Sequence, residues 1–148
     1  MALELYMLGL IVQDMAKSLE FYRRLGVAIP TGSEQKTHVE VKMGSGLTFF
    51  LDSSPSRWDP SFARQQDHAL QQAPGGYRSI LEFYLNTRDA VEAKYIELIE
   101  LGYQSHRAPY ETSFGMCFAM INDPDGNTIL LSGDLEKSED TNGIPTSS

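Results

Sequence analysis

Hydrophobic and polar positions along the chain first predict a strand and then a helix. Leu5–Val12 is a run of apolar and β-branched residues that is typical of a strand. Apolar residues then recur at helical spacing from Met15 to Leu25. Asp14 offers an N-cap in front of this stretch, and Gly26 suits the position after a helix end. The pattern therefore predicts an amphipathic helix directly after the first strand.

A predicted hairpin follows, and the order strand, helix, strands then returns. His38–Lys42 and Leu47–Leu51 alternate around a glycine turn, which indicates two paired strands. In the second series Ser79–Leu85 reads as a strand, and Thr87 or Asp89 can cap a helix. The remaining predicted elements are the helical face Val91, Tyr95, Leu98 and Gly102, the strand Phe114–Ile121, the turn Asp123–Asn127 and the strand Thr128–Ser132.

The two series align as an internal duplication. Asp14 aligns with Asp89 and Gly26 with Gly102, offsets of 75 and 76 residues, and the segment GLTFFL aligns with GNTILL at an offset of 80. We therefore expect one domain over residues 1–134, with module one at about 4–52, a linker at 53–78 and module two at about 79–133. A short helix is possible at Ser61–Gln72, and the polar tail 135–148 is expected to be disordered.

Composition narrows the classes of function. The chain has one cysteine, Cys117, which excludes an internal disulfide and favours a reducing compartment, so a cytoplasmic location is expected. No apolar run reaches the roughly 20 residues of a membrane helix, and no signal peptide is recognisable. A net charge of −8 without a basic stripe argues against nucleic acid as a partner.

Two segments resemble a known family. LGLIVQDMAKSLEFYRRLG, residues 8–26, resembles the opening of the vicinal oxygen chelate superfamily, which includes glyoxalases, bleomycin-resistance proteins and extradiol dioxygenases. NDPDGNTILL, residues 122–131, resembles its closing segment. The resemblance implies an α+β fold in which two βαβββ modules form a curved mixed sheet with a cleft and carry their helices on the outer face. It also implies a homodimer.

The resemblance further implies where metal-dependent members take their ligands. Those four positions hold Met7, Phe50, Glu82 and Leu130, of which only Glu82 is a hard donor. Catalytic cations need at least three donors from His, Asp, Glu or Cys. His38, His68 and His106 form no recognised ligand motif in the sequence. We therefore predict that the chain has no metal site and no cofactor, as in the metal-lacking, bleomycin-resistance-like branch.

Glu82 interrupts the apolar strand SILEFYL, where a carboxylate must find a partner. It is either a ligand-binding anion, or a general base, or a structural carboxylate paired with Arg78, Arg107 or Tyr84. Alternation along the strands directs Met7 and Tyr84 toward the same cleft. Phe50 and Leu130, at former ligand positions, would make the floor of that cleft apolar.

Other candidates come from the linker and the second module. Trp58 lies in the irregular linker and is interpreted either as an anchor or as a ligand contact. Tyr110 would lie at the opposite rim, unless it is a core or dimer contact. Asp52 and Asp59 are expected to be solvated turn carboxylates, and Cys117 to be a buried, inert thiol.

Two main hypotheses for function follow. The first is a metal-free protein that binds and sequesters a small aromatic or cationic molecule, such as an antibiotic or another xenobiotic. The second is a lyase, isomerase or dioxygenase of the same superfamily. Such an enzyme would be metal-dependent through unrecognised ligands, or metal-free with Glu82 as its base. A third possibility is an accessory domain with a vestigial cleft. The donor count favours binding, with a homodimer expected and neither nucleic acid nor membrane as partner.

Overall fold

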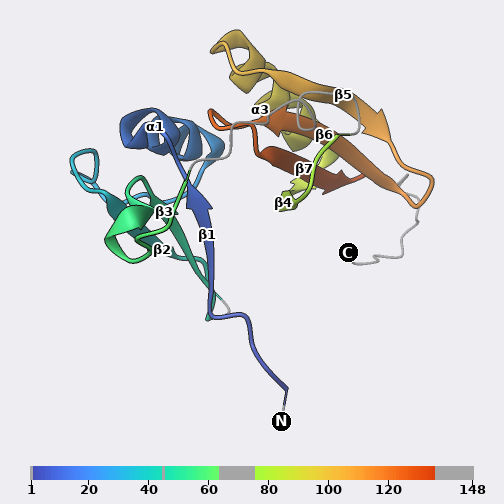
Figure 1. Cartoon of the computed structure of the whole chain (residues 1–148). Helices are drawn as coiled ribbons and strands as arrows, with labels where there is room; N and C mark the ends of the chain where they lie inside the picture. The colour runs from blue at the N-terminus through green and yellow to red at the C-terminus, as the bar shows by residue number, and fades with distance from the viewer. Residues whose placement is uncertain (1, 45, 64–75, 136–148) are drawn as a thin grey trace. The chain divides into compact units, whose positions relative to one another are not determined.

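The strands hydrogen-bond into two separate sheets, one in each half of the chain (Figure 1). The structure is a computed structural model that describes residues 2–44, 46–63 and 76–135. The chain divides into two compact units, Met1–His68 and Ala69–Ser148, and each unit has its own sheet and its own helix. Among the described residues, no helix is both long and apolar enough to cross a membrane.

The first unit carries a three-stranded sheet in the order β1-β3-β2. β1 runs parallel to β3, and β2 pairs antiparallel with β3, which confirms the predicted hairpin. The elements are β1 (Met7–Ile11), α1 (Met15–Leu25), β2 (His38–Lys42), β3 (Thr48–Asp52) and the 3-10 turn η1 (Pro55–Arg57).

Helix α1 begins and ends where the sequence predicts. The Asp14 carboxylate accepts a hydrogen bond from the Lys17 backbone N–H at 3.1 Å, and Gly26 takes a φ of 123° that a residue with a side chain rarely adopts. Leu19, Phe21 and other apolar residues of the helix are buried. They form the core of the first unit together with Val12, Val39, Val41, Phe49 and Leu51.

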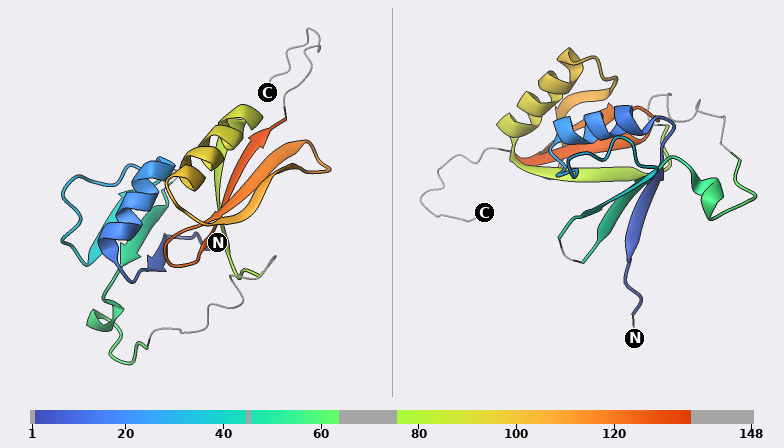
Figure 2. Two further views of the ribbon diagram at one scale, coloured as in Figure 1. Left: turned by 90° about the horizontal axis from the view of Figure 1, so that it is seen from above. Right: turned by 90° about the vertical axis from the view of Figure 1, so that its left-hand side faces the viewer.

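The second unit carries a four-stranded sheet in the order β4-β7-β6-β5. β4 is parallel to β7, whereas β7, β6 and β5 pair antiparallel. Helix α3 lies across one face of this sheet, as both views of Figure 2 show. The elements are β4 (Ile80–Thr87), α3 (Arg88–Glu100), β5 (Ser105–Glu111), β6 (Met116–Asn122) and β7 (Thr128–Asp134).

The core of the second unit lies between α3 and the sheet. Thr87 caps the helix by accepting a hydrogen bond from the Ala90 backbone N–H at 3.1 Å, so Thr87 rather than Asp89 is the N-cap. Val91 and Leu98 of the helix are fully buried. Their counterparts on the sheet are Leu81, Cys117, Ala119, Ile121, Ile129 and Leu131.

The predicted α+β class and the two related modules are confirmed, with two differences. The resemblance implies one more strand in the first module, but residues 27–37, between α1 and β2, form turns in which Ser33 donates to the Pro30 carbonyl at 2.8 Å and Lys36 N–H donates to the Ser33 carbonyl. The first module therefore has three strands and only the second is a complete βαβββ unit. Strand β5 was not predicted, because its sequence SHRAPYE is polar and contains Pro109, which suits only an edge strand.

Candidate functional site

Most of the predicted site residues of the second unit share the face of its sheet that α3 does not cover. We call this the helix-free face. Cross-strand pairing places its side chains in two adjacent rows of four. The first row is Glu82, Leu130, Met120 and Arg107, and the second row is Tyr84, Ser132, Phe118 and Tyr110. The predicted residues Glu82, Tyr84, Leu130 and Tyr110 thus lie together, on strands β4, β7 and β5.

Glu82 is an exposed carboxylate with a serine partner. The Ser132 hydroxyl, which is fully buried, donates to Glu82 Oε2 at 2.7 Å. Tyr84, whose hydroxyl donates to Asp134, is not the partner of Glu82, and no described ion pair joins Glu82 to Arg78 or Arg107. Among the described residues Glu82 forms no ion pair. One oxygen is therefore oriented by the fold, and the carboxylate keeps its capacity to accept from a ligand.

Tyr84 lies next to Glu82 on the same face and is about half exposed. Its hydroxyl donates to Asp134 Oδ2 at 2.6 Å. This hydrogen bond to a carboxylate, with a smaller effect from burial, raises the pKa of Tyr84 above its ordinary value of 10.0. Tyr84 therefore stays a neutral phenol that presents its ring at the edge of the helix-free face.

An aromatic cluster lies at the β5 side of the same face. The Tyr110 and Phe118 ring centroids are 6.0 Å apart in an edge-to-face arrangement, and Phe114 packs on Phe118 in the same way at 5.8 Å. The guanidinium carbon of Arg107 lies 3.5 Å from the centroid of the Tyr110 ring. Phe114, predicted as the start of a strand, lies in the turn before β6 and is 67% exposed.

Register irregularities in β5 bring Arg107 and Tyr110 onto one face. Arg107 pairs with Met120 and Tyr110 with Phe118, so a step of three residues on β5 matches a step of two on β6. A regular strand would direct two residues separated by three positions to opposite faces. Sequence alternation cannot show this, so the sequence indicates Arg107 only as a structural partner of Glu82.

In the first unit, the predicted floor residue Phe50 lies on the face of the sheet away from α1. Its ring lies over Gly9 of β1, where a Cβ atom would stand only 2.0 Å from Phe50 Cζ. The ring is also 5.0 Å from the imidazole of His38. Phe50 thus packs on its own sheet, beside a half-buried Met7 two positions before Gly9 on β1.

Asp52 is not the solvated turn carboxylate that the sequence suggested, because its side chain is completely buried. Oδ1 accepts from the Ser54 backbone N–H at 2.7 Å, and Oδ2 accepts from His38 Nδ1 at 2.7 Å. Arg57 and the Trp58 indole N–H each donate to Oδ2 at 3.3 Å. The sequence could not show this, because all these partners converge from β2 and the η1 turn only in the folded chain.

Trp58 is tied to the buried carboxylate of Asp52, as an anchor would be, and its second interpretation as a ligand contact stays a prediction. Its indole N–H is bound to Asp52, yet 57% of the side chain is exposed. Asp59, the other expected turn carboxylate, accepts from the backbone N–H and hydroxyl of Ser61 at 3.1 and 2.8 Å. Asp59 thus stabilises a local turn.

His38 lies between two carboxylates. Nδ1 faces Asp52 at 2.7 Å and Nε2 faces Glu40 at 2.9 Å. Burial lowers the pKa of His38, but the hydrogen bonds to Glu40 and Asp52 outweigh it and hold the pKa above 6.5. Burial likewise raises the pKa of Asp52, and the hydrogen bonds from His38, Ser54 and Trp58 outweigh this and lower it below 3.8. The two carboxylates thus stabilise the imidazolium form of His38 relative to that of an isolated histidine.

The metal-ligand positions implied by the family do not fit a catalytic cation. Met7 and Phe50 in the first unit and Glu82 and Leu130 in the second supply a single carboxylate. In the described part of the chain, no group of three His, Cys, Asp or Glu residues is arranged to hold a metal ion. His68 lies outside the described residues.

Cys117 and His106 are two further candidates, and both lie among packed side chains. Cys117 is buried on the helix side of β6, and burial together with the charge of Glu92 raises the pKa of its thiol above 9.0. His106 packs edge-on against Tyr77 with ring centroids 5.6 Å apart. The burial and the raised pKa of Cys117 are those of an inert thiol, whereas the buried Nε2 of His106 has no hydrogen-bond partner among the described residues.

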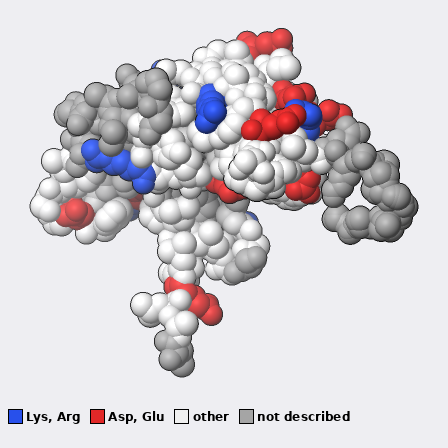
Figure 3. All heavy atoms as spheres, turned by 90° about the vertical axis from the view of Figure 1, so that its right-hand side faces the viewer, with Lys and Arg blue, Asp and Glu red and all other residues white. Residues whose placement is uncertain are grey.

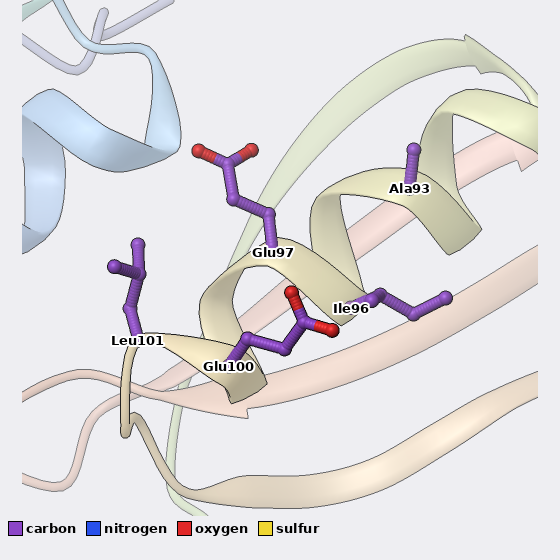
Figure 4. A pocket seen from close by; sticks show the side chains of 5 residues that line it. All are labelled: Ala93, Ile96, Glu97, Glu100 and Leu101. Carbon is purple, nitrogen blue, oxygen red and sulfur yellow. The ribbon is translucent and has the colours of Figure 1, made fainter.

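A hollow of about 480 Å³ lies on the side of α3 away from the sheet. Figure 4 shows that all its side chains project from the α3 segment. They are Ala93, Ile96, Glu97, Glu100 and Leu101. One helical segment cannot surround a small molecule with convergent polar groups, so the hollow is a weaker candidate than the helix-free face.

Charges on the described surface are mixed. On the side that Figure 3 shows, basic and acidic side chains of described residues both appear, and acidic ones lie beside one of the basic groups. Several basic side chains of the described residues form ion pairs with nearby acids, such as Arg88 with Glu111 and Lys94 with Glu97 at 3.0 Å. Such pairs are screened by solvent and contribute little to stability.

The paired modules, the α+β sheets and the position of Glu82 define a protein of the vicinal oxygen chelate class. The family model described as the Glyoxalase/Bleomycin resistance protein/Dioxygenase superfamily matches residues 5–131. The chain therefore belongs to this superfamily, as its opening and closing segments indicated. No curated protein matches the chain.

Solved structures show the same fold at low sequence identity. A glyoxalase/bleomycin resistance protein/dioxygenase family enzyme from Burkholderia phytofirmans PsJN is 18% identical with a TM-score of 0.70, covering 90% of this chain and all of its own. A glyoxalase-related enzyme from Fulvimarina pelagi is 18% identical with a TM-score of 0.69, covering 88% of each chain. A lactoylglutathione lyase from Agrobacterium tumefaciens is 18% identical with a TM-score of 0.60, covering 88% of this chain and 92% of its own.

Proposed function

We propose that this chain is a small-molecule-binding member of the superfamily and that its ligand lies on the helix-free face of the second sheet. The observation that carries this proposal is the pair of side-chain rows on that face. They combine aromatic and apolar groups with a few oriented polar groups, which is the usual composition of a ligand site. The Tyr110 and Phe118 rings suit an aromatic ligand, and Glu82 suits its cationic or hydrogen-bond-donating group.

Binding is proposed to be independent of a metal ion. The donor set at the four family positions supplies one carboxylate, and the Ser132 hydroxyl orients this carboxylate toward a role as hydrogen-bond acceptor. We further propose that binding serves to sequester an antibiotic or another xenobiotic. The support for this is membership of a superfamily that includes bleomycin-resistance proteins.

The location of binding is testable with methionine methyl groups. Met120 and Met116 lie on the helix-free face, whereas Met15 is buried in the core of the first unit. Protein labelled with ¹³C at the methionine methyls is titrated with biphenyl probes that carry an aminomethyl group, a carboxylate or both. We expect saturable shifts of the Met120 signal, with and without chelator, and no shift of Met15.

The control distinguishes binding at the helix-free face from non-specific binding elsewhere on the protein. Unchanged Met120 and Met116 signals with every probe up to about 1 mM, where even weak binding is visible, would contradict the proposal. A shift confined to Met15 would contradict it equally. Loss of binding on addition of chelator would contradict only its metal-independent part.

An enzyme remains the second candidate, and one observation favours it. Glu82 is at a position where metal-dependent relatives carry a ligand, and it is held by Ser132 on a face with aromatic side chains, as a general base would be. One structural neighbour is named a lactoylglutathione lyase. Turnover of a bound probe or of a glutathione thiohemiacetal that disappears in Glu82→Gln would replace the binding proposal with this one.

A homodimer is proposed as the assembly. Helix α1 buries its apolar residues within its own unit, so the helix leaves little apolar surface. The segment that leads into β1 leaves more, because Leu3, Leu5 and Tyr6 are 99, 68 and 75% exposed. Light scattering at micromolar concentration is expected to give twice the mass of the 16.5 kDa chain, and a monomeric mass would contradict the proposal.

A further inference from the structure

We infer that the ligand of the helix-free face is dipolar: a small molecule with a cationic or donor group at one end, an anionic group at the other and an apolar middle. This inference rests on the proposed function and adds the chemical class of the ligand. Its basis is a single cross-strand row in which Glu82 and Arg107 occupy the two ends and Leu130 and Met120 the middle.

The register establishes this row strand by strand. Glu82 on β4 pairs with Leu130 on β7, Leu130 pairs with Met120 on β6, and Met120 pairs with Arg107 on β5. Neighbouring strands lie about 4.8 Å apart, so three spacings separate the backbones of Glu82 and Arg107 by roughly 14 Å. The carboxylate and the guanidinium are therefore too far apart to pair with each other directly.

Both charged ends are available to a ligand. Glu82 and Arg107 are exposed, and neither forms an ion pair with any other described residue. Between them Leu130 and Met120 are 5 and 7% exposed, which makes a closely packed apolar floor. A dipolar molecule lying along the row would pair its opposite charges with the two ends and cover this floor with its apolar middle.

Both ends are also oriented before a ligand arrives. Ser132 donates to Glu82 at 2.7 Å, and the guanidinium of Arg107 stacks 3.5 Å above the Tyr110 ring. Stacking on an aromatic ring leaves the edge N–H groups of a guanidinium free to bind a carboxylate in bidentate fashion. Groups held in place lose less conformational entropy on binding, so each end should contribute more than a mobile surface charge.

The adjacent row of side chains indicates which chemical class the middle of the ligand belongs to. Tyr84, Phe118 and Tyr110 lie beside the floor, with Ser132 buried among them. Three rings along one side favour a flat, conjugated middle over a bulky aliphatic one, because aromatic groups gain from edge-to-face and stacked contacts. The Tyr84 hydroxyl is occupied by Asp134, so this row offers ring surface rather than further charge.

The test compares three probes of one shape on the unaltered protein. They are 4'-(aminomethyl)biphenyl-4-carboxylic acid, which is dipolar, and the two biphenyls that carry only the aminomethyl group or only the carboxylate. Affinities are measured by calorimetry, with Met120 methyl shifts as the reporter of location. We expect the dipolar probe to bind at least about tenfold more tightly than either singly charged probe. Equal affinities of the three probes would overturn the inference.

Matched variants assign the two ends. In Arg107→Gln the dipolar probe should lose its advantage over the aminomethyl probe, and in Glu82→Gln its advantage over the carboxylate probe. Arg24→Gln on α1 and Glu100→Gln on α3 are the charge-matched controls and should leave all affinities unchanged. An advantage that persists in both site variants would place the dipolar ligand elsewhere and overturn the inference.

The outcomes separate this inference from the proposed function. If no biphenyl probe shifts the Met120 signal, the proposed function itself fails. If singly charged and dipolar probes bind equally at Met120, binding on this face stands and only the dipolar class of ligand is lost. The comparison on unaltered protein does not depend on the variants, so poor folding of Arg107→Gln or Glu82→Gln would still leave a result.

Discussion

The ring of Phe50 on β3 lies across Gly9 on β1, at a position where a Cβ atom on Gly9 would be 2.0 Å from Phe50 Cζ. Gly9 and Phe50 are register partners on the face of the first sheet away from α1. Only a residue without a side chain lets the ring lie flat against the neighbouring strand. At a position where the family implies a metal ligand, this chain instead packs an aromatic ring on its own backbone.

This contact predicts an overpacking penalty at Gly9. Gly9→Ala should lower the free energy of unfolding by about 1–3 kcal/mol, because the Phe50 ring must move off the sheet to admit the methyl group. Urea denaturation measures the change. Phe50→Leu removes the obstructing ring atoms, so Gly9→Ala should cost much less in a Phe50→Leu background. Equal costs in both backgrounds would show that the ring is not the obstacle.

The buried position of Asp52 predicts that its substitution lowers the free energy of unfolding and changes the fluorescence of Trp58. Asp52→Asn removes the charge that binds His38, Arg57 and Trp58 in a completely buried position. We expect a loss of about 2–3 kcal/mol in the free energy of unfolding, the scale of hydrogen bonds to a buried charge. Trp58 is the only tryptophan, so its fluorescence reports on the same site. Its emission maximum and quenching by acrylamide should change, whereas Asp59→Asn at the neighbouring turn should leave both nearly unaltered.

His38 predicts how stability depends on pH. The pKa of His38 in the folded chain is raised above 6.5. The contribution of its charged form to the free energy of unfolding is therefore complete below pH 6.5 and is lost as the pH rises through the folded pKa. Asp52 has a lowered pKa, so its contribution is lost as the pH falls below 3.8 through the folded value. The groups facing His38 are Asp52 and Glu40, with Arg57 on the far side of Asp52.

The His38 imidazole resonances measure this directly. Their titration by NMR should give a pKa above 6.5, which falls in Asp52→Asn because one stabilising charge is lost. His38→Gln should flatten the pH dependence of the urea midpoint above 6.5. A titration of His38 at or below 6.5 in the unaltered protein would contradict the double pairing with Asp52 and Glu40.

The donor set predicts the metal content of the purified protein. One carboxylate among Met7, Phe50, Glu82 and Leu130 is too few donors for a tightly bound divalent transition metal. Protein purified without chelator should carry far less than one equivalent of zinc, iron, nickel or manganese by elemental analysis. About one equivalent per chain, removed by Glu82→Gln, would show that Glu82 ligates a metal together with donors that the resemblance does not identify.

The local elements of the fold were predictable from the sequence because their causes are local. Asp14 and Gly26 mark the two ends of α1, and the glycine turn after Lys42 closes the β2–β3 hairpin. On β4 the buried Leu81 alternates with the exposed Glu82. Strand β5 was missed for the same reason. Pro109 and the polar residues around it carry no alternating pattern, and their pairing depends on β6.

Sequence alone thus determined the superfamily, the two modules and the residue types at the family's ligand positions, since these depend on short motifs and on counting donors. The tertiary structure decided which of those residues meet. Irregular pairing brings Arg107 and Tyr110 onto one face, and convergence of β2, β3 and η1 buries Asp52 among His38, Arg57 and Trp58. Strand register and side-chain burial are set by distant segments, so no local pattern can encode them.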